Sequence, residues 1–322
     1  MVKGKISGTF VDFSEQPHKD RELLAWSLTD WKEEMQDMLD AGIDTVILAR
    51  TMRFGAVYYH SHFFETHLER DYIKPFMEAA GETGMNVFIS GMISDHFFRS
   101  NDKDFIRMMQ RDVFIYEKVL TELLDIYAEH PHIRGIYISH EADNENMASP
   151  ARFLAAQNFF ANLYSALKKE TSLPVLSSPF FTKSASPKDL ADFWNRFLDR
   201  PMFDILAMQD GIGCNRDIDP IDIPLYYNLL APIFKSKGIE FWNNVETFSF
   251  NPGYRESGFD RSKIWLKTAP IDRVELQYEA GKPFVSRTIT WEFGHFLGRR
   301  QAGKDFYQTF KQWNVQEDRE KI

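Results

Sequence analysis

The sequence contains one cysteine, Cys214, among 322 residues. A single thiol excludes a disulfide within the chain. No run of roughly 18 consecutive apolar residues occurs, so the sequence predicts no membrane-spanning helix. Basic residues are also in deficit, because 38 Lys and Arg stand against 47 Asp and Glu, for a net charge of −9. Since binding to a nucleic-acid backbone needs a basic surplus, this balance argues against nucleic acid as a partner.

Two nucleotide-binding motifs are absent as well. No Gly-x-Gly-x-x-Gly follows the first predicted strand, and no glycine-rich loop ending in Gly-Lys-Ser/Thr occurs. The first residues, Met1-Val-Lys-Gly-Lys, lead directly into that strand without the apolar stretch of a signal peptide. We therefore expect a cytoplasmic protein, while noting that removal of a signal peptide would leave the same sequence.

What the sequence does contain is an alternation of short β-rich segments with longer amphipathic ones. The predicted strands begin roughly 40 residues apart, which is too long for hairpins and typical of strand–helix units. They are Ile6–Phe13, Asp44–Arg50, Asn86–Ser90, Arg134–Glu141, Pro174–Phe180, Asp204–Asp210, Ile239–Glu246 and Arg287–Glu292. The sequence thus predicts an α/β fold, a single (β/α)8 TIM barrel over residues 1–322 with a frayed tail at 316–322. A doubly wound open sheet has the same alternation, but eight units fit the barrel with none left over.

Helix signals lie between the predicted strands. The helix that begins near Asp30 is predicted to end at Gly42, a C′ glycine. Ser149 and Ser186 are each followed by proline, which predicts an N-cap and a first helical turn at both places. Three helices are thereby expected on the outside of the barrel, and further ones over residues 104–130 and 303–313.

In a parallel barrel the loops after the strands build the active site, and polar and aromatic residues gather there in this chain. Side-chain alternation places Glu141 opposite in direction to Ile138, which we expect to face the outer helices. Glu246 is likewise opposite to Val245. Both carboxylates are therefore predicted to point into one mouth. For the sixth strand, alternation does not decide between Gln209 and Asp210.

Two carboxylic acids that face each other across a pocket are the catalytic groups of glycosidic bond cleavage. The sequence predicts a retaining glycoside hydrolase, with Glu246 as nucleophile, Glu141 as acid/base, and Arg50 or Asn244 keeping Glu246 ionised. Trp242, Trp291 and Tyr58 are predicted to stack on sugar rings. The remaining predicted substrate-binding residues are Asp12, Arg50, His96, Asp143, Gln209, Asp210, Asn244 and Glu292. The expected partner is a carbohydrate substrate, without a metal or organic cofactor.

Other functions fit the same residues. Glu141, Asp210, Glu246 and Glu292 could form an oxygen cage for a divalent ion in a sugar isomerase or epimerase. A barrel that binds carbohydrate without catalysis is a third possibility, because fold alone does not establish activity. Each glutamate could also be a salt-bridged residue of the barrel rim. Metal content and neutral replacements at the two glutamates distinguish these alternatives.

Several short segments resemble a known family. They are Ile6-Ser-Gly-Thr-Phe-Val-Asp-Phe13, Trp31, Ala41-Gly-Ile-Asp-Thr-Val-Ile-Leu48, Tyr137-Ile-Ser-His-Glu-Ala-Asp143 and Gln209-Asp-Gly-Ile-Gly213. In this order they resemble a largely uncharacterised bacterial family of the glycoside hydrolase TIM-barrel superfamily, from Ile6 to about Gly298. The resemblance implies a barrel fold and carbohydrate hydrolysis. The positions of the acids also resemble those of retaining glycosidases, in which an Asn usually precedes the first acid; here His140 takes that place.

Overall fold

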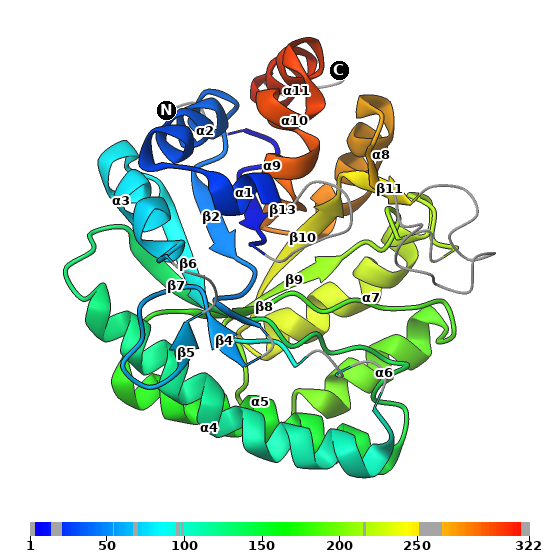
Figure 1. Cartoon of the computed structure of the whole chain (residues 1–322). Helices are drawn as coiled ribbons and strands as arrows, with labels where there is room; N and C mark the ends of the chain where they lie inside the picture. The colour runs from blue at the N-terminus through cyan, green and yellow to red at the C-terminus, as the bar shows by residue number, and fades with distance from the viewer. Residues whose placement is uncertain are drawn as a thin grey trace.

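The computed structural model describes residues 4–13, 21–53, 55–66, 70–94, 97, 100–214, 217–250 and 266–316. Eight parallel strands close into a barrel, and helices surround it (Figure 1). The strands are β1 Gly8–Val11, β2 Thr45–Leu48, β6 Asn86–Ser90, β7 Ile133–Ile138, β8 Val175–Ser177, β9 Ile205–Gln209, β10 Glu240–Glu246 and β13 Arg287–Trp291. The predicted TIM barrel is confirmed, and each observed strand overlaps a predicted one.

The barrel closes between its first and last strands, where Gly8 pairs with Ile289 and Thr9 with Thr290. Every neighbouring pair is parallel, so a helical crossover is needed between strands. The main helices are α2 Leu28–Asp40, α3 Ile73–Thr83, α4 Asp102–Ile126, α5 Pro150–Glu170, α6 Pro187–Phe197, α7 Ile223–Ser236, α8 Ile271–Gly281 and α11 Lys304–Val315. Short ones are α1 Arg21–Ala25, α9 Phe293–Phe296, α10 Arg299–Ala302 and the 3₁₀ helix η2 Lys282–Phe284.

The helix ends follow the predicted signals. Ser149 and Ser186 cap α5 and α6, and each serine side chain accepts a bond from the backbone N–H three residues on. Gly42 follows α2 with a φ of 85°, as a C′ glycine should. The predicted frayed tail at 316–322 lies outside the described residues except for Gln316, the C-cap of α11.

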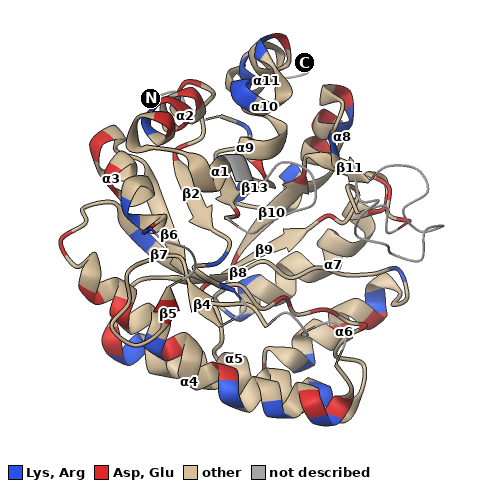
Figure 2. Cartoon of the chain, in the orientation of Figure 1, with Lys and Arg blue, Asp and Glu red and all other residues tan. Residues whose placement is uncertain are grey.

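Side-chain alternation divides the core into two layers. The smaller layer fills the barrel and includes Phe10, Phe88, Tyr137 and Trp242. The larger layer lies between strands and helices and includes Ile138 and Val245, as predicted. Charged residues lie mainly on the outer helices, and the barrel strands contain few of them (Figure 2). None of the helices in the described part of the chain has the length and hydropathy needed to cross a membrane.

Two small sheets lie at the end of the barrel where the strands finish. β3 Met52–Arg53, β4 Ala56–Val57 and β5 Glu65–Thr66 form one between β2 and α3. β11 Phe248–Phe250 and β12 Leu266–Thr268 form the other, after β10. Neither sheet was predicted, because strands of two or three residues give no detectable periodicity.

The packing of Gly135 against Phe88 inside the barrel gives a first prediction. A Cβ at Gly135 would overlap the Phe88 ring, which is buried in the inner layer. We expect Gly135→Ala to lower the free energy of unfolding by about 1–3 kcal/mol, the usual effect of overpacking a core. Urea unfolding followed by circular dichroism measures this change.

Gly81→Ala is the matched control for that prediction. Gly81 lies within α3, and the nearest atom to an added Cβ is His130 Nε2 at 3.4 Å. Because alanine favours a helix over glycine, this variant should be unchanged or more stable by up to about 1 kcal/mol. Equal stability of the two variants would contradict the packing described for the barrel interior.

Candidate functional site

The two predicted catalytic glutamates lie at the end of the barrel where the strands finish. Glu246 is the last residue of β10 and is in register with Trp291 on β13. Glu141 follows β7, which ends at Ile138. Because β7 and β10 are the fourth and seventh strands of one closed parallel barrel, both residues belong to the same mouth.

Glu246 is buried beneath the loop that follows β9. Its side chain is 2% exposed, and its Oε2 accepts a hydrogen bond of 2.7 Å from the backbone N–H of Cys214. A Cβ at Gly213 would lie 2.8 Å from the Glu246 Cβ and 2.5 Å from the Phe248 carbonyl oxygen. Glycine is therefore required for the loop to approach the carboxylate this closely. The sequence Gly211-Ile-Gly213 could have indicated this close approach of the loop, but the sequence analysis assigned no functional role to Cys214.

Asp210 is a second carboxyl group beside Glu246, and it is fully buried. Its Oδ1 accepts bonds from the backbone N–H groups of Ile212 (3.2 Å) and Glu246 (3.3 Å), and its Oδ2 accepts one from Gln277 (2.6 Å). Burial, followed by the neighbouring charge of Glu246, raises the pKa of Asp210 to about 7. Asp210 is thus a buried support of Glu246, and its contact with a sugar hydroxyl stays a prediction.

Helix α8 supplies two further supports that the sequence did not reveal. Arg273 donates to the backbone carbonyl oxygens of Glu246 (2.9 Å) and Phe248 (2.6 Å). Its Nε donates to Gln277 Oε1 at 3.1 Å, and Gln277 in turn donates to Asp210. These residues lie on a helix that the sequence describes only as amphipathic. No local motif distinguishes a side chain directed at a strand end from one directed at solvent.

Glu141 has different surroundings and is partly exposed. Its Oε1 accepts a hydrogen bond of 2.9 Å from the side-chain amide of Gln209, which also donates to the Ser178 carbonyl oxygen at 2.7 Å. This bond decides which of Gln209 and Asp210 on the sixth strand faces the mouth, a question that the sequence alternation left open. Gln209 points into the mouth, whereas Asp210 lies beneath it.

His140 does not reach the mouth. Its imidazole is fully buried, and its Nε2 lies 3.1 Å from Asp112 Oδ2 on α4. The rings of Phe97 and Phe159 pack against it, with centroids 5.2 Å and 4.6 Å away. In this chain the residue before the predicted acid thus anchors the end of β7 to a helix and has no contact with a substrate.

Arg50, Asp12 and Glu292 form a buried polar chain on the opposite side of the mouth. Arg50 pairs with Asp12 at 3.0 Å, and the Asp12 backbone N–H donates to Glu292 Oε2 at 3.1 Å. Glu292 also contacts His295 Nδ1. Burial opposes the charge of Arg50, but Asp12 and then Tyr58 and Glu141 raise its pKa above the usual value.

The two predicted partners of Glu246 bond to other residues. Arg50 pairs with Asp12, and the Asn244 amide donates to the Ser178 hydroxyl at 2.9 Å inside the barrel. The backbone N–H of Cys214 donates to Glu246 instead. Asp12, Asn244 and Glu292 are buried supports of the mouth, so their predicted contact with substrate is not supported.

Only one of the three predicted stacking rings is accessible. Trp291 is partly exposed beside Phe10, with ring centroids 5.1 Å apart. Tyr58 is 0% exposed and packs against Phe13, and Trp242 is 4% exposed with Arg287 at 5.0 Å over its ring. Tyr58 and Trp242 are thus packed in the core, and their stacking on a sugar stays a prediction that this burial does not favour. The predicted contact of His96 lies outside the described residues.

A cavity of about 520 Å³ flanks the loop that carries Glu141. Asp143 lines it and accepts bonds from the backbone N–H groups of Glu145 (2.8 Å) and Asn146 (2.6 Å). Phe180 closes another side. The lining includes three acidic side chains, the amide of Asn146 and the hydroxyl of Ser149, which suit the hydroxyl groups of a carbohydrate.

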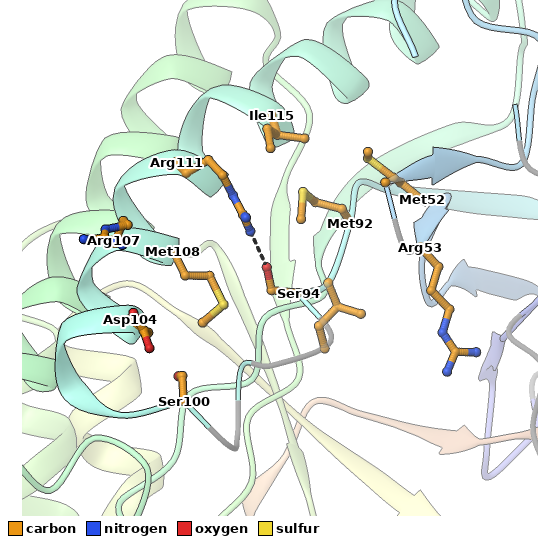
Figure 3. A pocket seen from close by; sticks show the side chains of 12 residues that line it. Met52, Arg53, Met92, Ser94, Ser100, Asp104, Arg107, Met108, Arg111 and Ile115 are labelled. Carbon is orange, nitrogen blue, oxygen red and sulfur yellow. Dashed lines mark hydrogen bonds between the residues drawn. The ribbon is translucent and has the colours of Figure 1, made fainter. Parts of the chain in front are cut away.

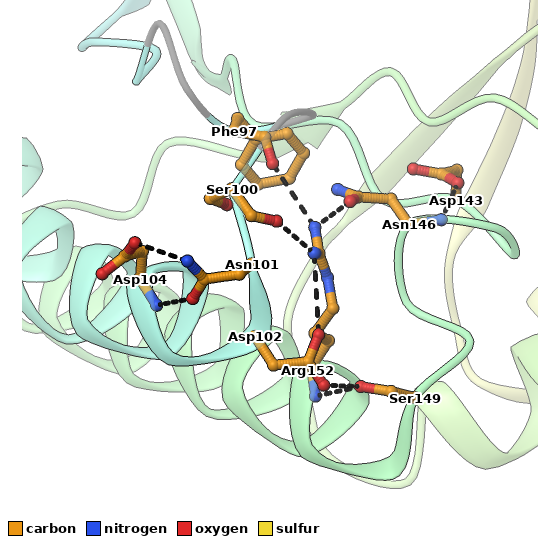
Figure 4. Close-up of polar contacts among 9 residues, drawn as sticks. All are labelled: Phe97, Ser100, Asn101, Asp102, Asp104, Asp143, Asn146, Ser149 and Arg152. Carbon is orange, nitrogen blue, oxygen red and sulfur yellow. Dashed lines mark hydrogen bonds and ion pairs between the residues drawn. The ribbon is translucent and has the colours of Figure 1, made fainter.

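Arg152 fastens the loops around this cavity. It donates to the backbone carbonyl oxygens of Ser100 (2.8 Å) and Phe97 (3.5 Å) and to the side chain of Asn146, and it lies 3.8 Å from Asp102 (Figure 4). These partners come from the loops after β6 and β7. Arg152, on α5, therefore joins the third and fourth strand–helix connections on the side of the mouth that holds Glu141.

The acids proposed for a metal cage are not arranged as one. No group of three or more His, Cys, Asp or Glu side chains among the described residues is placed to hold a metal ion. Asp210 and Glu292 each point to protein partners instead. The geometry does not support the hypothesis of a metal-dependent isomerase.

Solved structures with a similar fold include proteins described as glycoside hydrolases. A Bacteroides thetaiotaomicron protein described as "a putative alpha-L-fucosidase" is 22% identical, with 97% of this chain and 96% of that one covered and a TM-score of 0.78. A GH18 chitinase from Pseudoalteromonas aurantia is 11% identical, with 96% and 99% covered and a TM-score of 0.58. A GH99 endo-alpha-mannosidase from Bacteroides thetaiotaomicron is 13% identical, with 93% and 86% covered and a TM-score of 0.52. Identities this low establish the fold alone.

Comparison with proteins of curated function finds no match. Comparison with family profiles finds a match over residues 6–302. This range is close to the one over which the sequence motifs predicted a resemblance. The chain therefore belongs to the family described as domain of unknown function DUF4434.

Proposed function

We propose that this protein hydrolyses glycosidic bonds with retention of configuration, with Glu246 as nucleophile and Glu141 as acid/base. The observation that carries the proposal is the contrast between the two carboxyl groups. One is buried and accepts a backbone N–H bond, and the other is partly exposed and accepts an amide bond. Unequal surroundings are what allow two carboxyl groups to take different roles in one site.

Glu246 suits the nucleophile because its carboxyl group has a fixed hydrogen-bond donor. The Cys214 N–H donates to Oε2 and holds the carboxyl group beneath the loop that follows β9. Burial and the neighbouring Glu246 raise the pKa of Asp210 to about 7, so Asp210 holds its proton over the acid range. In the first step a Glu246 oxygen would attack the anomeric carbon as the bond to the leaving oxygen breaks.

Glu141 suits the acid/base because it must exchange protons with water during the cycle. Its partly exposed position permits that exchange, and Gln209 fixes its direction. It would give its proton to the leaving oxygen in the first step. In the second step it would take a proton from water as that water attacks the anomeric carbon and Glu246 is released. Trp291 and the acid-lined cavity at Asp143 are the surfaces proposed for the sugar.

Replacing the two glutamates tests this division of roles. On a panel of aryl glycosides that begins with the α-L-fucoside, in view of the relative described as an α-L-fucosidase, Glu246→Ala should abolish turnover. Added azide should restore it with an inverted product. Glu141→Ala should lower kcat by roughly 10²–10⁴-fold on poor leaving groups and less on activated ones, and azide should give a product of retained configuration. Product configuration is read by NMR.

The exposed Glu279→Ala on α8 is the control for these variants and should keep wild-type rates. Wild-type rates for Glu141→Ala and Glu246→Ala on a cleaved substrate would refute the assignment. An inverted product from the wild-type enzyme would leave the pair in place but make one glutamate a base toward water.

Asp210 gives a prediction for stability against pH. Its pKa is raised from 3.8 to about 7 on folding, so between these values the folded state holds a proton that the unfolded state has released. The free energy of unfolding should therefore fall as pH rises through this window, by at most ~1.4 kcal/mol per pH unit, and level off above it. Asp210→Asn should remove this part of the dependence.

Urea unfolding at about pH 5 and about pH 8 measures the difference for each protein. Glu34, whose pKa burial raises to about 8, contributes with the same sign in both proteins, and its effect cancels in the comparison. Asp192→Asn replaces an exposed aspartate on α6 and should follow the wild type. An Asp210→Asn protein with the wild-type pH dependence would show that Asp210 is ionised throughout.

A further inference from the structure

A second cavity, of about 540 Å³, lies between α4 and the small sheet β3–β5 (Figure 3). It differs in chemistry from the acid-lined cavity at Asp143. Its walls are formed largely by thioether and branched aliphatic side chains, and its charged lining residues are mostly basic. These lining residues are Met52, Met92, Ile93, Met108, Ile115, Arg53, Arg107 and Arg111, with Asp104 as the one acidic member.

The methionines give this cavity an apolar wall. Met108 on α4 and Met92 in the loop after β6 point into the same space, and Met52 lies beyond them (Figure 3). A thioether is a weak hydrogen-bond acceptor, so this wall suits sugar hydroxyls poorly. It suits aromatic or alkyl groups, because thioethers are polarisable and adapt to the shape of a ring.

The basic residues give the cavity a preference for negative charge. Arg107 is exposed on α4 and forms no hydrogen bond or ion pair with any residue that the structure describes. Arg111 donates to Ser94 at 2.9 Å and forms an ion pair of 2.6 Å with Asp112. Asp104 accepts a bond of 2.8 Å from the neutral side-chain amide of Asn101. Arg107 is therefore the basic lining residue best placed to meet an anion.

The wall of this cavity is also part of the support of Glu141. Ser94 donates to Asp112 at 2.6 Å, and Asp112 lies 3.1 Å from His140, the residue before Glu141. The cavity is thus connected through two buried side chains to the predicted acid. A general acid protonates the leaving oxygen, so the leaving group lies on the side of the mouth that holds Glu141.

We propose that this cavity binds an aromatic or acyl group that carries a carboxylate, sulfate or sulfonate. The apolar part lies on Met52, Met92 and Met108, and the acidic part faces the arginines. Resting on the proposed function, the substrate carries this group on its leaving side. The binding itself requires no catalysis and is measured without it.

Titration with three naphthalene probes tests the proposal. Naphthalene-1-sulfonate should bind more tightly than the neutral 1-naphthol, and the cationic 1-naphthylmethylamine should bind most weakly. Arg107→Glu should weaken the sulfonate about fivefold or more and change 1-naphthol by less than about twofold, since only the first has a charge to lose. Lys103→Glu makes the same change of net charge on the same exposed turn of α4, away from the lining, and should have a much smaller effect.

Methionine methyl NMR locates the probes. Ring currents from a bound naphthalene should shift the methyl signals of Met52, Met92 and Met108, assigned through Met→Leu variants. Met109 is the internal control, because it follows Met108 in α4 but lines a separate groove against α5. Shifts confined to Met109, equal binding of all three probes, or equal effects of Arg107→Glu and Lys103→Glu would each overturn the proposal. Because the titration needs no turnover, an inactive enzyme that binds the sulfonate would refute only the proposed hydrolysis.

Discussion

The burial of two carboxyl groups side by side is the constraint on which this mouth depends. Asp210 and Glu246 are 0% and 2% exposed, and two adjacent negative charges in such a place are strongly unfavourable. The surroundings meet this constraint in two ways. Backbone N–H groups and Gln277 donate to the pair, and Asp210 retains a proton to about pH 7. Gly213 allows the loop to approach Glu246 closely, and Gln277 on α8 points inward and donates to Asp210.

Glu141 depends on an independent set of supports. Gln209 on β9 fixes its carboxylate, while His140 and Asp112 tie its backbone to α4. These bonds involve residues other than Gln277 and Arg273, which support the buried pair. Different supports allow one carboxyl group to be buried while the other stays near solvent. This separation is the physical basis for assigning them different roles.

The sequence could predict what depends on periodicity, and little that depends on contacts between distant elements. The spacing of apolar segments gave the eight strands, and alternation gave the inward direction of Glu141 and Glu246. The depth of a residue along a strand could not be predicted. Trp242 and Trp291 have similar sequence patterns, but Trp242 lies near the start of its strand and Trp291 at the end of its strand. The burial of Tyr58, in a loop, and of Asp210, after β9, was not accessible from the sequence either, because it depends on contacts with distant elements. Arg273 and Gln277 were missed since nothing in α8 marks a helix face that turns toward a strand end.

The position of His140 bears on how a sugar could be recognised. The sequence comparison with retaining glycosidases led us to expect an Asn there, whose amide can donate to a hydroxyl beside the reacting carbon. In this chain the imidazole is fully buried against α4 and has no access to the mouth. The amide that does reach Glu141 comes from Gln209, two strands further along the barrel. Under the proposed function, Gln209 on β9 would therefore bind that hydroxyl, whereas retaining glycosidases usually use the residue before the acid, here His140 after β7.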